Sequence, residues 1–155
     1  MTRPSAPIRM AHVALTVTAD ELNEVSQFYQ SVFGWTLEFE INGVFGHHQF
    51  LTDQHGARIE LLTREVVERP KWTEDPPGHI CFAVPEEEFD SLLERARNAG
   101  VDIGQPQVAT SETRGETDPE TGELRTGGGT SHFIFFDDPS GNCLEVSTGA
   151  CRFLT

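Results

Sequence analysis

Two histidines and two glutamates stand at matched positions in the chain and could together bind a divalent metal ion. His12 and His79 each open a six-residue segment that ends in valine, and Glu60 and Glu145 each lie four residues after a glycine. Imidazole nitrogens and carboxylate oxygens are ligands for several divalent metals. Four such ligands in an octahedral shell would leave two adjacent positions for oxygens of a substrate. The set therefore predicts a metal centre that binds a chelating substrate.

Each of these four residues, taken singly, has a simpler explanation. A histidine at the start of a strand is usually a polar strand end, and a glutamate within a strand usually faces solvent. Glutamate is nevertheless depleted in strands, and burying its charge is costly unless the carboxylate is paired or metal-bound. Because the same two residue types recur at equivalent places, a shared metal-binding role is favoured over four separate explanations.

An internal duplication explains these matched positions. His12–Val17 and His79–Val84 both place apolar residues at alternate positions, as half-buried strands do. Each segment is followed by an apolar stripe at helical spacing, and the predicted helices end at Gly34 and Gly100. These glycines lie 22 residues after the first histidine and 21 after the second. The two halves are therefore predicted to share one fold.

The start of each predicted helix carries its own signal. Thr18–Glu21 has the pattern of a capping box, in which the first and fourth residues satisfy each other's backbone N–H groups. In the second half Pro85 is suited to the first helical turn. Glu86–Glu88 follow it, where the helix dipole favours negative charge.

Three short strands are predicted after each helix, so that each half reads strand, helix, three strands. They cover about Thr36–Glu40, Phe45–Leu51 and Ala57–Leu62 in the first half, and Val101–Gln107, Thr130–Asp137 and Asn142–Ser147 in the second. The second half is longer by 18 residues, because Glu60 follows His12 by 48 residues and Glu145 follows His79 by 66. The extra residues fall in Ala109–Gly129, whose Thr, Glu, Gly and Pro content predicts a loop.

The duplicated halves and the closing motif Asp138–Glu145, which reads DPSGNCLE, resemble the vicinal oxygen chelate superfamily. That group includes glyoxalase I, methylmalonyl-CoA epimerase, extradiol dioxygenases, fosfomycin-resistance enzymes and bleomycin-resistance proteins. The resemblance covers about Met10–Thr148. It implies an α+β fold of two βαβββ modules that form a cupped, incomplete barrel around the metal, and a homodimer whose modules pair within or between chains. We expect one glyoxalase-like domain over residues 1–155, with modules at about 10–66 and 78–148 and a linker at about 67–77.

Within this superfamily the ligand set His12, Glu60, His79 and Glu145 resembles that of bacterial glyoxalase I. The resemblance implies isomerisation or lyase chemistry, in which one divalent ion (Ni, Zn, Co, Mn or Fe) binds two substrate oxygens and stabilises an enediolate. A glutamate moves a proton between neighbouring atoms, and Glu145 is the predicted base with Glu60 as the other candidate. Thr16 and Arg64 replace a basic and an amide residue of the glutathione site of that enzyme, and both replacements argue against glutathione as co-substrate.

Two other functions remain open from the sequence. His12, His79 and Glu145 could form a two-histidine, one-carboxylate triad for Fe(II) in a dioxygenase. Ring-cleaving members of the superfamily carry a catalytic tyrosine shortly before the last glutamate ligand, whereas this chain has Phe133–Phe136 there. The third possibility is a binding protein that sequesters a small molecule, although the bleomycin-resistance proteins usually lack the metal ligands.

Because side chains alternate along a strand, further residues are expected on the same sheet face as a predicted ligand. Arg58 shares the face of Glu60 and could bind an anionic substrate or pair with a carboxylate in solvent. Of the adjacent His47 and His48 only one can point into the cup, although an exposed or edge pair of histidines is the favoured explanation. His132 could line the site. We interpret Cys81 and Cys143 as small packed residues rather than nucleophiles.

Composition excludes several classes of partner. The formal net charge of −14, from 11 basic and 25 acidic residues, would repel nucleic-acid phosphates. No apolar run approaches the roughly 20 residues that span a bilayer. The first residues lack the apolar segment of a secretory signal, so a cytoplasmic location is predicted. Three cysteines are too few for a disulfide framework and are expected to be reduced.

Overall fold

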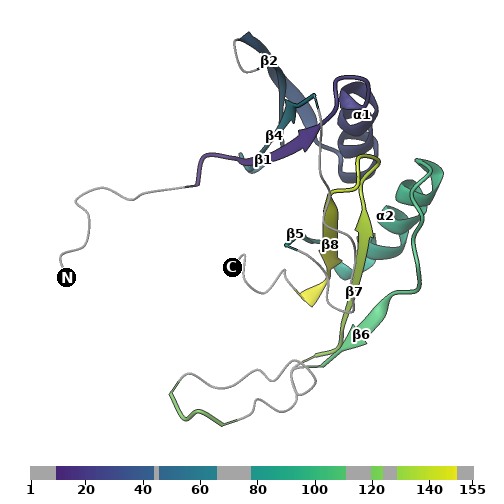
Figure 1. Cartoon of the computed structure of the whole chain (residues 1–155). Coiled ribbons are helices and arrows are strands. Elements are labelled where there is room, and N and C mark those ends of the chain that lie inside the picture. Colours follow the sequence, from purple (N-terminus) through teal and green to yellow (C-terminus); the bar gives the residue numbers. More distant parts are fainter. Residues whose placement is uncertain (1–9, 44–45, 66–77, 111–119, 124–128, 150–155) are drawn as a thin grey trace, which may run out of the picture. The chain divides into compact units, whose positions relative to one another are not determined.

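The computed structural model describes residues 10–43, 46–65, 78–110, 120–123 and 129–149 (Figure 1). The chain divides into two compact units, Met1–Glu68 and Arg69–Thr155, and each is described by itself. The predicted linker at 67–77 lies outside the described residues, as do residues 111–119 and 124–128 of the predicted loop. No helix within the described ranges is long and apolar enough to cross a membrane.

The first unit is a four-stranded sheet with one helix. Its elements are β1 (Val13–Val17), α1 (Leu22–Phe33), β2 (Thr36–Gly43), β3 (Gly46–Thr52) and β4 (Arg58–Thr63). The strand order is β1-β4-β3-β2, with β1 parallel to β4 and the other neighbours antiparallel. Helix α1 contacts β2, β3 and β4 and contributes Val25, Phe28, Tyr29 and Val32 to the core.

The second unit repeats this arrangement. Its elements are β5 (Ile80–Ala83), α2 (Glu86–Asn98), β6 (Gln107–Ala109), β7 (Ser131–Asp137) and β8 (Cys143–Ser147). The strand order is β5-β8-β7-β6, again with the first and last strands parallel. The predicted order of strand, helix and three strands is therefore confirmed in both halves.

Both helices end at the glycines that the sequence indicates. Gly34 adopts a left-handed conformation with φ of 71°, and its N–H donates to the carbonyl of Gln30. Gly100 is also left-handed, with φ of 86°. At the start of α1 the Glu21 carboxylate accepts the N–H of Thr18 at 3.0 Å, which is one of the two bonds of a capping box. Local sequence chemistry thus sets the length of each helix.

The first strand after α2 differs from the prediction. Val101–Gln107 was expected to be a strand, but β6 covers only Gln107–Ala109, which pairs with β7. Pro106 has no N–H to give to a ladder, and Gly104 weakens the extended segment before it. The strand consequently begins only after the proline.

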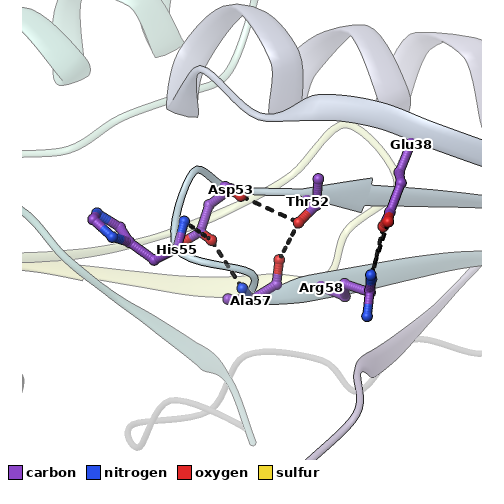
Figure 2. Close-up of polar contacts among 6 residues, drawn as sticks. All are labelled: Glu38, Thr52, Asp53, His55, Ala57 and Arg58. Carbon is purple, nitrogen blue, oxygen red and sulfur yellow. Dashed lines mark hydrogen bonds and ion pairs between the residues drawn. The ribbon is translucent and has the colours of Figure 1, made fainter.

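Equivalent aspartates shape the turn before the last strand of each unit. Asp53 Oδ1 accepts the backbone N–H groups of His55 and Ala57, both at 2.8 Å (Figure 2). Asp138 Oδ1 accepts those of Ser140 at 3.0 Å and Asn142 at 2.8 Å. Each turn contains a glycine at positive φ, four residues before the strand glutamate. The turn therefore fixes the register that presents this glutamate.

Removing Asp138, which is buried, should cost more stability than removing Asp53, which is only partly buried. We expect Asp138→Ala to lower the free energy of unfolding by about 2 to 3 kcal/mol, because buried N–H groups lose their acceptor. Asp53→Ala should cost about 1 kcal/mol, since water can replace the carboxylate there. Urea denaturation measures both values, with Asp138→Asn as the control that keeps an acceptor oxygen. Equal losses in the two alanine variants would contradict this account.

Candidate metal centre

The first predicted pair of ligands meets on one face of the first sheet. Glu60 lies in the middle of β4, opposite Ala14 of β1, and His12 precedes β1. His12 Nε2 lies 2.9 Å from Glu60 Oε2. The Glu60 side chain is 11% exposed, so its charge is largely removed from bulk water. Phe50, which pairs with Glu60 across β3 and β4, contacts the His12 ring edge-on at 5.6 Å between centroids.

The second predicted pair has the same geometry in the second unit. Glu145 lies in β8, opposite Cys81 of β5, and His79 precedes β5. His79 Nε2 lies 3.0 Å from Glu145 Oε2. Phe135 pairs with Glu145 across β7 and β8 and contacts the His79 ring edge-on at 4.9 Å. The histidine, glutamate and phenylalanine thus recur as a set, with each histidine one residue before the strand that was predicted to begin with it.

The structure brings the four predicted ligands together two by two, one pair in each unit. In each pair an imidazole Nε2 and a carboxylate oxygen face one another within 3.0 Å. No group of three or more His, Cys, Asp or Glu side chains in the described ranges has the arrangement of a metal site. The donor atoms nevertheless suit a divalent ion, because imidazole and carboxylate bind such ions and two carboxylates balance the charge. The shared four-ligand centre therefore stays a prediction.

A second imidazole joins the first pair. His48 Nδ1 lies 2.5 Å from Glu60 Oε1, so Glu60 contacts an imidazole through each of its oxygens. The neighbouring His47 instead places its Nε2 3.2 Å from Glu40. The sequence required that only one of these two histidines share the face of Glu60. Alternation along β3 could not tell which histidine this is, because the answer depends on how β3 pairs with β4. His48 lies opposite Leu62, two residues after Glu60, and therefore on the same face as Glu60.

His132 does not line the face that carries Glu145. Its Nδ1 lies 2.7 Å from a carboxylate oxygen of Glu86 on α2, and its ring approaches Phe89 of the same helix. His132 immediately precedes Phe133, which is in register with Ser147 of β8. Successive residues of a strand point to opposite faces, so His132 is directed toward the helix. The expectation that it could line the site is wrong for this reason.

The two described cysteines are poor nucleophiles. Burial, together with the charge of Glu145 and a hydrogen bond to it, raises the pKa of the Cys81 thiol to about 12. Burial, followed by the charges of Asp137 and Glu145, raises the pKa of Cys143 to about 11. The thiolate is the reactive form, and it is scarce at neutral pH when the pKa is so high. Both cysteines are free of disulfides; Cys143 is buried, as expected for a packed thiol, whereas Cys81 is exposed and the interpretation as a packed residue is wrong for it.

Arg58 is engaged by a carboxylate. Its Nε and Nη2 donate to the two oxygens of Glu38 at 2.7 and 2.8 Å, a bidentate ion pair between β4 and β2 (Figure 2). The hydrogen bond from Arg58 lowers the pKa of the Glu38 carboxyl. Of the two roles considered for Arg58, the structure shows the ion pair in solvent.

Replacing Arg58 should have a small effect that depends on pH. Because the folded pKa of Glu38 is lowered, the pair stabilises the fold at neutral pH and ceases to do so once Glu38 is protonated. The difference in melting temperature between wild type and Arg58→Gln should therefore be small at pH 7 and shrink as the pH falls below about 4. Thermal melts across this range measure it. A difference that grows toward acidic pH would contradict the assignment.

Comparison with known proteins places the chain in a family. Residues 9–146 match the model of the Glyoxalase/Bleomycin resistance protein/Dioxygenase superfamily. The chain belongs to this superfamily. The matched region contains all four predicted ligands, and the resemblance to the vicinal oxygen chelate proteins is confirmed.

Individual relatives include fosfomycin-resistance proteins. Metallothiol transferase FosB of Shouchella clausii is 26% identical over 135 residues, which are 87% of this chain and 77% of the relative. A mutant of FosX from Listeria monocytogenes, solved with Mn(II) and 1S,2S-dihydroxypropylphosphonic acid, is 19% identical with a TM-score of 0.66, over 97% of this chain and 100% of that one. FosX of Mesorhizobium loti is 18% identical with a TM-score of 0.62, over the same shares of the two chains.

These likenesses confirm the predicted fold class. The superfamily match and the FosX structures agree with an α+β fold built from two βαβββ modules. At identities near 20% the structural likeness concerns the fold. The reaction of this chain depends on its own residues.

Proposed function

We propose that this chain is a divalent-metal-dependent enzyme that chelates a small oxygen-rich substrate and catalyses isomerisation or lyase chemistry by proton transfer. The observation that carries the proposal is the repeated His–Glu pair, with Nε2 to carboxylate distances of 2.9 Å for His12 and Glu60 and 3.0 Å for His79 and Glu145. Each pair has a phenylalanine against its histidine. The duplication has kept the same three residue types together in both units, which supports a shared role for the two pairs.

One ion would take His12, Glu60, His79 and Glu145 as its ligands, with the two pairs supplied by one chain or by two chains of a homodimer. When bound, a divalent ion polarises a carbonyl group of the substrate and makes the neighbouring C–H more acidic. We propose Ni, Zn, Co, Mn or Fe as the metal, since mixed imidazole and carboxylate ligands suit each of them. A single functional domain over residues 1–155 and a cytoplasmic location belong to the same proposal.

Glu145 is the carboxylate that would carry the proton. Its side chain is 20% exposed and contacts one imidazole, that of His79, and the Cys81 thiol, which is a weak hydrogen-bond donor. Glu60 is 11% exposed and contacts two imidazoles, those of His12 and His48. A base must turn between a ligand position and the substrate carbon, and the less constrained carboxylate can do so at lower cost. This contrast supports Glu145 as the base and Glu60 as a fixed ligand.

Ring-cleaving dioxygenase chemistry has less support from the residues around Glu145. Phe133 and Phe135 occupy the strand positions that face the Glu145 side of the sheet, and neither can donate or accept a proton. The one tyrosine of the chain, Tyr29, lies on α1 and is fully buried in the core. A tyrosine acid or base for ring cleavage therefore has no candidate among the described residues of this face.

A phosphonate substrate, as in the FosX complex, is the second candidate. The relative binds its phosphonate together with Mn(II), and this chain carries a donor set suited to such an ion. A phosphonate dianion would favour cationic side chains. On the described strands of the first sheet Arg58 is held by Glu38, and the Glu145 face of the second sheet carries neither lysine nor arginine. A weakly charged carbonyl substrate is therefore preferred.

Exchange of a carbon-bound proton with solvent tests the proposal directly. Metal-loaded protein is incubated in deuterated water with small α-hydroxy and α-oxo carbonyl compounds, free and as thiol adducts, and with fosfomycin in parallel. We expect deuterium at the carbon next to a carbonyl, detected by nuclear magnetic resonance, and no loss of fosfomycin. Loss of fosfomycin without any exchange would favour the second candidate. Metal-loaded protein that acts on none of these compounds would count against both candidates.

A further inference from the structure

The two units differ in the aromatic side chain that stands two residues before the phenylalanine paired with each strand glutamate. Phe50 and Phe135 pair with the glutamates, and the residue two places earlier in the same strand is His48 in the first unit and Phe133 in the second. His48 and Phe133 lie opposite Leu62 and Ser147, which occupy equivalent places in β4 and β8. The first unit thus has an imidazole where the second has an aromatic hydrocarbon.

This imidazole makes a directed contact. His48 Nδ1 lies 2.5 Å from Glu60 Oε1, while His12 Nε2 lies 2.9 Å from Oε2. A carboxylate can only accept, so His48 donates its Nδ1–H to Glu60. The His48 side chain is 13% exposed, and a charge-assisted hydrogen bond is strong where the groups are largely shielded from water. Rotation of the Glu60 carboxylate would break both contacts together.

We propose that His48 is a positioning residue that holds the Glu60 carboxylate with Oε2 presented as a metal ligand. This inference rests on the proposed function. Hydrogen-bond partners of metal ligands orient those ligands, and their loss typically weakens metal binding by about 10- to 100-fold. Phe133 cannot make the equivalent bond to Glu145, so that carboxylate lacks a second imidazole and has only the thiol of Cys81, a weak donor, beside its contact with His79.

The position of the donor atom can be tested with two amide side chains. His48→Asn places an amide N–H near the site of Nδ1, whereas His48→Gln carries its amide one bond further out, near the site of Nε2. His48→Phe copies the residue found in the second unit. His47→Phe is the matched control, because His47 is the adjacent histidine and contacts Glu40 instead of Glu60. Comparing Asn with Gln separates the hydrogen bond from the bulk and polarity of the side chain.

The measurement is the dissociation constant of Mn(II) and of Zn(II), obtained by titration calorimetry on the metal-stripped full chain, with a thermal melt of each stripped variant. We expect His48→Gln and His48→Phe to bind about 10- to 100-fold more weakly than wild type, with His48→Asn and His47→Phe close to wild type. Equal affinity in wild type and His48→Gln, or equal losses in the Asn and Gln variants, would overturn the positioning role of His48 but not the proposed function. A wild-type chain that binds neither ion would overturn the proposed function as well. Should His48→Phe not fold, the Asn and Gln comparison still decides.

Discussion

Glu145→Gln is expected to lower the rate of deuterium exchange into substrate by about 100- to 10,000-fold at saturating metal, which is the usual contribution of a positioned general base. The amide keeps the size of the side chain and still has an oxygen, but it cannot take up a proton at neutral pH. The rate is measured with each variant at several metal concentrations. This design distinguishes weaker metal binding, which added metal overcomes, from the loss of the base, which it does not.

A second His–Glu pair of the same unit supplies the control for this prediction. Glu86 contacts His132 at 2.7 Å, on the helix side of the second sheet. Glu86→Gln removes one charge and one His–Glu contact from the unit, and we expect it to exchange deuterium at the wild-type rate. Should Glu145→Gln retain the wild-type rate at saturating metal, the proton would have to be carried by another group, and Glu60 would be the next candidate.

Glu60→Gln is expected to raise the dissociation constant of the metal by more than about 100-fold, beyond the loss typical for a residue that only supports a ligand. The substitution removes a negative charge from a carboxylate that is 11% exposed and lies between His12 and His48. An uncharged amide oxygen is a weaker ligand and does not balance the charge of the ion. Titration calorimetry on the stripped protein gives the constant, and circular dichroism checks the fold.

Glu40→Gln is the matched control for Glu60→Gln. Glu40 also contacts a histidine of β3, His47 at 3.2 Å, but outside the His12–Glu60–His48 cluster. We expect its metal affinity to equal that of wild type. Iron bound equally well by wild type and Glu60→Gln would make Glu60 a bystander. That result would move the assignment to a triad of His12, His79 and Glu145 and to oxygenase chemistry.

Much of the fold could be predicted because its signals are local. Gly34 and Gly100 end the helices through left-handed conformations, which glycine adopts without steric cost. The aspartate turns before β4 and β8 depend on residues within five positions of one another. The bounds of β6 were predicted wrongly, as Val101–Gln107 instead of Gln107–Ala109. The pairing of β6 with β7 crosses the inserted segment, and no local pattern marks where such a ladder begins.

The site could be predicted only in part, since strand pairing decides which residues meet. The repeat identified His12, Glu60, His79 and Glu145, and the parallel pairing of first and last strands brings each histidine to its glutamate. The roles of His48 and His132 depend on the register and face of β3 and β7. Alternation along one strand gives two faces but does not say which one carries the site. His48 was therefore a candidate of equal standing with His47 until the strands were paired.

The number of metal ions bound per chain tests the central claim most directly. Wild type is purified without chelators and without air and analysed for metals, together with one double variant of each pair, His12→Ala with Glu60→Ala and His79→Ala with Glu145→Ala. The account predicts one ion per wild-type chain and none in either double variant, because each pair supplies half of one ligand set. Two ions per wild-type chain, with one ion left in each double variant, would contradict it by showing two separate sites. A wild-type chain without metal would contradict the metal-dependent function itself.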